Sequence, residues 1–522
     1  MFLFFVAEDG CFILRTGASC RVPHLMKRKS FSHAVKWSYA ATWGEKAFGA
    51  FFTFFLAALL GPKDFGVVSI AVVYVLFLQM LLDQGLATAL IQKKDLEPDH
   101  VNAVFWADMS LSLVFVGASI LLSRWWAAVN HAPQAAAIIS VLSLCIPIEG
   151  LAIVQKSLLS REMNFKSLSI RSNVSVLIGG GIGVGMAYAG WGVWALVGQQ
   201  ITRDLTALIL LWRLSRWRPR LAFSWKHLKD LMGFSVSNFI AQLGVFADTY
   251  ASAIVLGLFF GPVAVGLYRL ADRVMSTVLS AATSSIQAVS LPEFSRFQDQ
   301  PIELRKSVLT CIRLSSTVTL PALAGVAAVS ASLMATVGAQ WIPATGVLQI
   351  LCVLGMFFVF AFFTGPLLQA LAKVKLAAAL EWARTLAGIG LLLLAGFVAR
   401  GRPISYQIMG IALARFVIGA LLVTPVFLYL LMRLSGIAFR DLFSSIAPSM
   451  LASMGVVLSV LLFHSLGWLS TAKPAVLLAA EVFVGGITGL PILLLLDVQL
   501  RGAIARLIKR RTGFDVVAKE LA

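Results

Sequence analysis

Seven basic side chains lie within stretches of this chain that are otherwise almost wholly apolar. They are Lys46, Arg171, Arg203, Arg269, Arg273, Arg384 and Arg415. A charge at bilayer depth costs on the order of 3 kcal/mol or more, so it normally faces a wet cavity or a partner of opposite charge. Guanidinium groups also bind phosphate through paired N–H donors. These residues are therefore candidates for holding an anionic head group within a membrane.

Spacing refines this set of basic candidates. Arg269 and Arg273 are four residues apart, hence on one helix face, where together they are able to hold a diphosphate. Arg203 and Arg415 lie about 18 Å and about 17 Å into their predicted helices, at equivalent places in two halves of the chain. The alternative is local neutralisation within the membrane. It would pair Arg203 with Asp204, Arg269 with Asp272, and Arg384 with Glu381.

Acidic residues also occur in the apolar stretches. They are Glu45, Asp83, Asp108, Glu149, Asp248 and Glu481. Buried carboxylates of this kind serve in ion or proton coupling, and we expect that role first for Glu45, Asp83 and Asp248. The alternative for each is a structural partnership with a neighbouring base.

The elements that carry these residues are membrane-spanning helices. Hydrophobic residues make up 59% of the 522 residues, charged residues only 13%, and the mean hydropathy is +0.88. A soluble domain carries about 25% charged residues. Apolar runs of about 20 residues, long enough to cross the bilayer as helices, number fourteen. They fall near 38–60, 67–92, 102–122, 135–158, 167–189, 191–214, 232–258, 263–291, 307–336, 345–371, 376–399, 404–432, 445–467 and 474–496.

Charge between the spans sets their orientation, because lysine and arginine beside the spans collect in the cytoplasm. With the amino end inside, the even-numbered connections, the span ends beside them and the tail hold twenty-five basic residues, and the odd-numbered connections hold five. Both termini are therefore predicted to be cytoplasmic. The net charge of +19 then belongs to helix ends that face anionic lipid, and nucleic acid is not expected as a partner.

A repeated motif predicts an internal duplication. Leu-Leu-Gly-Pro at 59–62 and Phe-Phe-Gly-Pro at 259–262 are each followed by Gly four residues after the proline. Six predicted spans separate the copies, so both halves face the same way, related by an axis along the membrane normal. We expect an all-α protein with these parts: a cytoplasmic extension 1–37, whose true start is suspected at Met26; a first lobe 38–214; a basic linker 215–231; a second lobe 232–432; two extra helices within 433–496; and a basic tail 497–522.

Signatures of enzymes and cofactors are missing from the sequence. The glycine-rich run 179–185 lies inside a predicted span with no strand before it, so close helix packing is the better interpretation than a nucleotide loop. The five cysteines form no C-x-x-C pair and the six histidines no ligand cluster along the sequence. No catalytic residue, cofactor or metal is therefore expected.

Several short stretches carry a family resemblance. They are Leu-Gly-Pro-Lys-Asp-Phe-Gly at 60–66, Asp-Gln-Gly-Leu-Ala-Thr-Ala-Leu-Ile-Gln at 83–92, Gly-Val-Trp-Ala-Leu-Val at 192–197, Trp-Arg-Pro at 217–219, Ala-Asp at 247–248, and Gly-Leu-Tyr-Arg-Leu-Ala at 266–271. With them the chain resembles the multidrug/oligosaccharidyl-lipid/polysaccharide (MOP) exporter superfamily, and within it the Wzx-type polysaccharide flippases. The resemblance runs from about 35 to 440. It does not identify the sugar.

The resemblance implies a flippase for undecaprenyl-diphosphate-linked oligosaccharide in the bacterial inner membrane, with a MATE-like pair of lobes. The basic residues would hold the diphosphate, while Asn238 and Gln242 would contact sugar hydroxyls. Membrane lipid and the polysaccharide polymerase or export machinery would be partners of an expected monomer. Two alternatives stay open: a drug or cation antiporter, which would favour an acidic cavity, and a membrane polymerase or ligase, which would need a larger outside loop.

Overall fold

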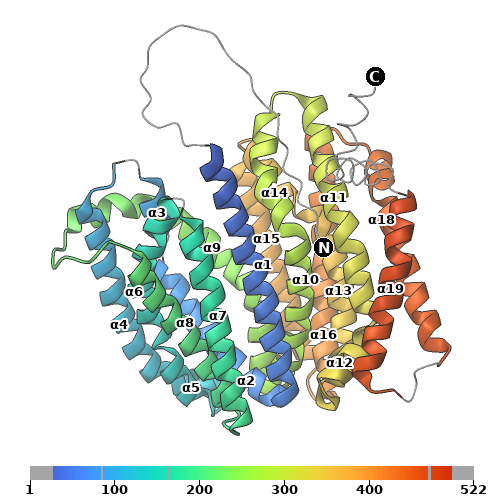
Figure 1. The fold of residues 1–522 in the computed structure, drawn as a ribbon, viewed down its shortest axis with the longest axis horizontal. Helices are drawn as coiled ribbons and strands as arrows, with labels where there is room; N and C mark the ends of the chain where they lie inside the picture. Colours follow the sequence, from blue (N-terminus) through green and yellow to red (C-terminus); the bar gives the residue numbers. More distant parts are fainter. Residues whose placement is uncertain (1–27, 84–85, 94, 163, 468–471, 497–522) are drawn as a thin grey trace, which may run out of the picture.

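The computed structural model describes residues 28–83, 86–93, 95–162, 164–467 and 472–496, and the described chain is helical throughout (Figure 1). The α-helices are α1 (Arg28–Leu59), α2 (Pro62–Asp83), α3 (Leu86–Gln92), α4 (Pro98–Val129), α5 (Ala135–Leu142), α6 (Cys145–Arg161), α7 (Phe165–Tyr188), α8 (Val193–Leu214), α9 (Trp225–Phe260), α10 (Pro262–Arg296), α11 (Pro301–Ala328), α12 (Ser330–Val337), α13 (Thr345–Ala361), α14 (Thr364–Ala370), α15 (Val374–Val398), α16 (Ile404–Phe416), α17 (Thr424–Ser435), α18 (Phe439–Ser465) and α19 (Pro474–Leu496). The 3₁₀ segment η1 covers Ala339–Ala344 and the π-helical segment η2 Val417–Val423. The suspected start at Met26 and the predicted basic tail lie outside the described residues.

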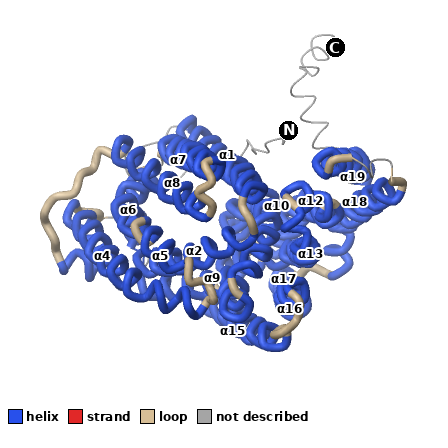
Figure 2. Tube along the Cα trace, turned by 90° about the horizontal axis from the view of Figure 1, so that it is seen from below, coloured by secondary structure: helices blue, strands red, loops and turns tan. Residues whose placement is uncertain are grey.

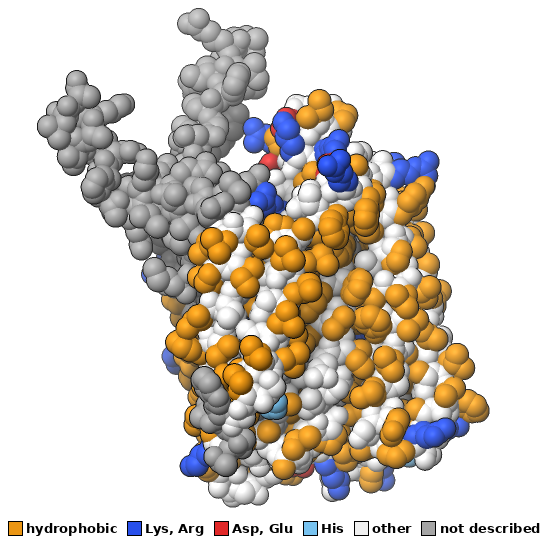
Figure 3. All heavy atoms as spheres, turned by 90° about the vertical axis from the view of Figure 1, so that its right-hand side faces the viewer, with side chains coloured by type: hydrophobic (Ala, Val, Ile, Leu, Met, Phe, Trp, Pro, Cys, Tyr) orange, Lys and Arg blue, Asp and Glu red, His pale blue; other side chains and the backbone are white. Residues whose placement is uncertain are grey.

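The helices form a multi-pass membrane protein. Within the described residues, 12 helical segments are long and apolar enough to cross a bilayer. The other two predicted spans correspond to α1 and α8, which have 32 and 22 residues and carry charged residues within them. Hydrophobic side chains cover the middle of the face seen in Figure 3, and lysine and arginine gather at its two ends. This distribution is the one that a hydrocarbon layer between two aqueous phases imposes.

Two boundaries of the sequence prediction, where one span follows another after only a few residues, are confirmed. Helices α7 and α8 part at residues 189–192, where Gly190 and Gly192 have φ of 79° and 52°. Helices α9 and α10 part at Gly261, whose φ is 78°. These left-handed conformations are open to glycine at little steric cost, so the glycines end the helices there.

Four predicted spans are not continuous α-helices in the described chain. Span 307–336 breaks at Val329, and in the other three the irregularity lies shortly before a proline. The pairs are Ser143 and Pro147, Phe362 and Pro366, and the π-helical Val417–Val423 and Pro425. Proline has no N–H and its ring crowds the carbonyl four residues earlier, so the hydrogen-bond ladder changes there. Pro292 and Pro321, by contrast, lie inside unbroken helices, so a proline alone is not sufficient to interrupt a helix.

The helices pack in two groups joined through α1, α2, α9 and α10 (Figures 1 and 2). In one group α4, α5, α6, α7 and α8 pack on one another, and α1 lies along α7. In the other, α10, α11, α13, α15 and α16 pack together, while α18 and α19 lie against α11 and α12. Helix α9 belongs to both, because it contacts α3 and α4 as well as α15 and α16. Viewed along the helices, α1 lies between α7 and α10 (Figure 2).

The repeated Gly-Pro motifs meet each other at the junction of the two groups. A methyl group on Gly66 would overlap the backbone carbonyl of Pro262, and one on Gly266 would overlap the carbonyl of Pro62. Each contact therefore has a counterpart 200 residues away with the roles exchanged. This reciprocity is the mark of a two-fold relation between the motif copies.

A second pair of contacts at the junction also involves two positions that lie 200 residues apart in the chain. The indole Nε1 of Trp341 donates a hydrogen bond of 2.8 Å to the carbonyl of Ala57, near the end of α1. At the corresponding position near the end of α9, Gly257 lies against the side chain of Asn130. The helix before each Gly-Pro turn is thus contacted by a residue from the opposite half of the chain.

Candidate functional site

The glycine-rich run of α7 positions α8 and its arginine. A Cβ on Gly179 would lie 2.8 Å from the Cβ of Arg203, and a Cβ on Gly183 would lie 2.7 Å from the Cβ of Gln199. Only glycine permits helices to approach this closely. The prediction that this run packs helices, rather than binding a nucleotide, is confirmed. Its consequence is that the backbone of Arg203 is fixed directly against α7.

Arg203 has the local partner that the sequence suggested. Its Nε lies 3.3 Å from Oδ1 of Asp204, and the side-chain amide of Gln200 donates to Oδ2 of Asp204 at 2.9 Å. The carboxylate is the more covered member, with 20% of its side chain exposed against 42% for Arg203. Asp204 is thus satisfied within α8, while much of the Arg203 guanidinium stays open.

A second basic group lies where α1 meets α10. A Cβ on Gly49 would be 3.7 Å from Nη2 of Arg273, so this guanidinium reaches across to α1. Arg273 is repelled by the charges of Arg269 and Arg203, and Lys46 by that of Arg273. Among the described residues, neither Lys46 nor Arg273 has a carboxylate within 4.0 Å. Basic groups from both halves of the chain therefore meet here, and Glu45 and Asp272 offset part of their charge from beyond 4.0 Å.

The two arginines proposed to act together on α10 differ in their surroundings. Contacts hold the side chain of Arg269, whereas the side chain of Arg273 is open. Arg269 lies 3.3 Å from Oδ2 of Asp272, and its guanidinium carbon is 5.4 Å from the centre of the Tyr250 ring. Both contacts fix its direction. Arg273 lies one turn further along the same face and is exposed. Sequence reasoning did not single out Tyr250, because its contact with Arg269 joins two different helices.

Asp248 on α9 is the centre of a second charged cluster. Its Oδ2 lies 3.2 Å from Nη2 of Arg384 and 3.8 Å from Nη2 of Arg415. Arg415 also donates to the backbone carbonyl of Asp248 at 2.9 Å, and Arg384 contacts Glu381 at 2.8 Å. The structure therefore brings Arg415 to Asp248, whereas Arg203, its predicted equivalent, lies near Arg273.

The space beside this cluster is small. Asp248, Arg384 and Arg415 line a cavity of about 20 Å³ together with Gly388 and Gly419, which belongs to the π-helical segment. This volume holds about one water molecule. A sugar or a diphosphate does not fit in this conformation, so the cluster joins α9, α15 and α16 rather than enclosing a head group.

Two further predicted residues lie on the facing surfaces of α1 and α7. The hydroxyl of Ser172 on α7 donates a hydrogen bond to the Glu45 carboxylate on α1. The neighbouring Arg171 has a buried Nε without a hydrogen-bond partner among the described residues. Glu45 thus ties α1 to α7 next to Lys46, and Arg171 adds another basic group to this side.

The other predicted positions give less information. Gln242 lies exposed on α9. Asn238 and Asp83 belong to α9 and to the end of α2, but their side chains lie outside the described residues. Glu149 pairs with Lys156 at 3.4 Å, and Glu481 with His464 at 3.1 Å, so these carboxylates have structural partners.

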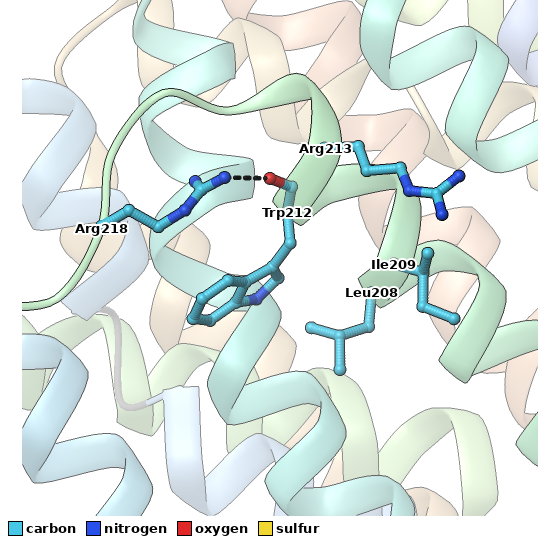
Figure 4. Close-up of a pocket in the computed structure, with 5 residues that line it drawn as sticks. All are labelled: Leu208, Ile209, Trp212, Arg213 and Arg218. Atoms are coloured by element: carbon cyan, nitrogen blue, oxygen red, sulfur yellow. Dashed lines mark hydrogen bonds between the residues drawn. The ribbon is translucent and has the colours of Figure 1, made fainter.

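A wider groove of about 420 Å³ lies at the end of α8 (Figure 4). It is lined by Leu208, Ile209, Trp212, Arg213 and Arg218. Arg218 donates from Nη2 to the carbonyl of Trp212 at 2.8 Å and lies 5.6 Å from the centre of its ring, while Arg213 points away from Trp212 (Figure 4). An apolar floor edged by two arginines at the end of a span suits lipid with an anionic head group.

Two of the histidines, which form no cluster along the sequence, are brought together by the fold. Glu97, His100 and His227 place possible ligand atoms within 4.8 Å of one another. The sequence hides this group because Glu97 and His227 are 130 residues apart and meet only when α9 folds onto α4. Asp230 adjoins it, and hydrogen bonds from Lys93 and His100 hold the pKa of this carboxyl below its ordinary value.

Comparison with known sequences identifies relatives of this arrangement. The model of a family described as "Polysaccharide biosynthesis protein" matches residues 55–346. The succinoglycan biosynthesis transport protein ExoT of Rhizobium meliloti (strain 1021) is 29% identical over 326 residues, 62% of this chain and 66% of that protein. The lipopolysaccharide biosynthesis protein WzxC of Escherichia coli (strain K12) is 26% identical over 355 residues, 67% of this chain and 72% of that protein. The chain thus spans about two thirds of the length of these relatives.

Solved structures share the fold at low sequence identity. The lipid II flippase MurJ in an inward closed conformation matches with a TM-score of 0.70 and 14% identity, over 88% of this chain and 98% of that one. An inward-facing multidrug resistance MATE family transporter of the MOP superfamily matches with a TM-score of 0.59 and 16% identity, over 75% of this chain and 95% of that one. The chain therefore has the fold of these proteins, as the sequence predicted.

Proposed function

This chain belongs to the polysaccharide biosynthesis protein family, and from that premise we propose that it moves undecaprenyl-diphosphate-linked oligosaccharide repeat units across the bacterial inner membrane. The movement runs from the cytoplasmic to the periplasmic leaflet and serves exopolysaccharide or O-antigen synthesis. The fold shared with a lipid II flippase and the relationship to ExoT and WzxC support this assignment.

The proposal includes a topology of fourteen transmembrane helices with both termini in the cytoplasm. Residues 38–214 and 232–432 form the two lobes, joined by the basic linker 215–231. Residues 1–37 are the amino-terminal extension, 433–496 provide two extra helices, and 497–522 form a basic tail. The reciprocal contacts of Gly66 with Pro262 and of Gly266 with Pro62 support this division, because they are what an axis between equivalent lobes produces.

The observation that carries the proposal is the meeting of basic groups from the two halves, of which Arg203 pairs with Asp204 while Lys46 and Arg273 have no carboxylate within 4.0 Å among the described residues. Lys46, Arg203 and Arg273 come from α1, α8 and α10, and Arg273 interacts unfavourably with Arg203 and, in turn, with Lys46. Placing like charges together in a bilayer is unfavourable unless an anion joins them. A diphosphate supplies two or more negative charges and accepts paired N–H donors. An acidic cavity, as a drug or cation antiporter would favour, is not what these residues build.

Transfer follows from rocking of the lobes around this charged group. The head group sits among the arginines, polar groups such as Gln242 and Asn238 contact the sugar, and the isoprenoid tail stays in lipid. A ligand shifts such an equilibrium only through different affinities for the two states. Glu45, Asp83 and Asp248 are proposed to couple the motion to an ion or proton gradient. Exchange at Asp248 requires Arg384 or Arg415 to move away from it.

Charge substitution in cells tests the proposal. In a strain lacking the protein, the lipid-linked repeat unit is expected to accumulate on the cytoplasmic face, and the wild-type gene is expected to reverse this. Arg273→Glu and Arg203→Glu should each reduce polymer export by roughly tenfold or more, the value of one or two charge-assisted hydrogen bonds. The repeat unit is measured by enzymatic labelling of the outer leaflet.

Matched variants separate substrate binding from folding. Arg273→Lys keeps the positive charge and should retain part of the export. Arg433→Gln removes an exposed arginine that contacts only Tyr429 among the described residues, and export should stay at the wild-type level. Normal export by the Arg203→Glu and Arg273→Glu variants, at equal amounts of protein in the membrane, would overturn the assignment of these residues.

A further inference from the structure

Two short sequence elements place metal-binding side chains on adjoining helices. Glu97 and His100 stand three residues apart at the start of α4, and His227 and Asp230 stand three residues apart at the start of α9. Residues three apart lie on one face of a helix. The two faces meet, because the rings of His100 and His227 are in edge-to-face contact with centres 4.5 Å apart.

The distances within this group resemble those of a metal site. His227 Nε2 lies 3.2 Å from Oε2 of Glu97, and His100 Nε2 lies 3.4 Å from Oδ2 of Asp230. Two ligands with bonds of about 2.0–2.1 Å to one tetrahedral zinc are roughly 3.3 Å apart. Both pairs already have this separation. Side-chain rotation has to close only the remaining gap between the pairs.

The surroundings hold the ligands in place. The imidazole of His100 is 4% exposed, and its Nδ1 accepts a hydrogen bond of 3.3 Å from the backbone N–H of Glu97. This bond leaves the ring proton on Nε2, so metal binding at Nε2 requires the other tautomer and releases the bond. The Nδ1 of His227 lies 2.6 Å from the Ser224 hydroxyl, which directs Nε2 towards Glu97. A contact of this second kind, in which the histidine donates from Nδ1, orients the histidines of metal sites. The side chain of Leu228 packs into a buried cluster beside this site, so the helix start cannot rotate freely.

We propose that Glu97, His100, His227 and Asp230 bind a divalent transition-metal ion of the zinc type, which fastens the start of α9 to α4. Two carboxylates balance the double charge of the ion, and two imidazoles select a borderline-soft metal over magnesium or calcium. Lys93 contacts the same oxygen of Asp230, Oδ2, as His100 does, so metal binding requires the ammonium group to move away from that oxygen. The site is separate from Arg203 and Arg273 and does not depend on the transported substrate.

Zinc binding to the purified full-length protein tests this proposal. Zn²⁺ is titrated in competition with a chromogenic chelator, and one equivalent per chain is expected to bind saturably. His227→Gln and Glu97→Gln should each weaken that affinity by at least about tenfold, since even outer-shell changes cost that much at metal sites. Both residues are partly exposed, so these variants avoid the buried His100. Zn²⁺ should also raise the melting temperature of wild type and not that of His227→Gln.

A matched histidine serves as control. His464 pairs with Glu481 at 3.1 Å, and no third ligand adjoins that pair among the described residues. His464→Gln is therefore expected to leave zinc affinity unchanged, and millimolar Mg²⁺ should not displace the bound zinc. The proposal is overturned if wild type and His227→Gln bind zinc equally, or if His464→Gln loses as much affinity as His227→Gln.

Discussion

The arginines within the membrane differ in how their charge is balanced. Arg269, Arg384 and Arg415 each have a carboxylate within 4.0 Å, and so does Arg203. Arg273 reaches across to α1 without one. A balanced arginine stabilises the junction between helices, whereas an unbalanced one is available to a passing anion. The two roles therefore fall on different residues of one connected group.

Asp248 illustrates the structural role and gives a stability prediction. Asp248→Asn would leave Arg384 and Arg415, whose side chains are 22% and 18% exposed, without this carboxylate. Removing one partner of a buried ion group is strongly destabilising, and partial exposure reduces the effect here to about 1–3 kcal/mol. A lower melting temperature in detergent is expected. Glu149→Gln, which removes only an exposed pair with Lys156, should shift stability by about 0.5 kcal/mol at most. Equal melting temperatures for both variants would refute this role.

The sequence predicted the charge pairs between near neighbours in the chain but not the pairs between residues far apart in it. The pairs of Arg203 with Asp204, Arg269 with Asp272 and Arg384 with Glu381 were predictable because their members are near neighbours on one helix. The contact of Arg415 with Asp248 joins residues 167 apart, and helix periodicity does not specify which helices touch. The group of Glu97, His100 and His227 was missed for the same reason.

At the scale of elements, the close contacts of Gly66 with Pro262 and of Gly266 with Pro62 lead to a stability prediction. Gly66→Ala should force α2 and α10 apart, because its methyl would overlap the Pro262 carbonyl, and Gly266→Ala should do the same through Pro62. Overpacking of this kind costs about 1–3 kcal/mol. The measurement is the melting temperature together with the yield of folded protein.

Gly61 supplies the matched control for these two glycines. It precedes the proline of the same motif, yet a Cβ there meets nothing within 4 Å. Gly61→Ala is expected to keep wild-type stability. If Gly61→Ala lowers the melting temperature as much as Gly66→Ala does, the close contact between the two Gly-Pro motifs is not the cause of the lost stability.

The positions of the spans were easier to predict from the sequence than the breaks within them. Hydropathy located the spans because a hydrocarbon layer imposes a minimum apolar length. It did not reveal the breaks before Pro147 and Pro366 or the π-helical turn before Pro425. A proline four residues downstream was the available signal, but Pro321 lies in a continuous helix. Whether a helix breaks depends on whether neighbouring helices provide a hydrogen bond to the carbonyl that the proline leaves without a partner. The sequence of one span does not contain that information.

At the scale of the whole molecule, the repeated Gly-Pro motifs lie at the junction where the two groups of helices meet. The fold shared with MurJ and a MATE transporter was reachable from the repeat, the spacing of spans and the distribution of charge. The long α9 was not anticipated as a bridge. Its 36 residues extend about 54 Å, further than a bilayer core requires. Leu228 and Leu231 at its start, before the apolar span Gln242–Phe260, pack in a buried cluster with residues of α3 and α4.

Transfer by the purified protein tests the account most directly. In proteoliposomes, wild type should move undecaprenyl-diphosphate-linked oligosaccharide between leaflets, measured by accessibility of the sugar to an external enzyme. The double variant Arg203→Gln/Arg273→Gln should transfer it at least about tenfold more slowly. Arg433→Gln should match wild type. Transfer by the double variant at the wild-type rate would contradict the claim that basic groups from both halves carry the anionic head group.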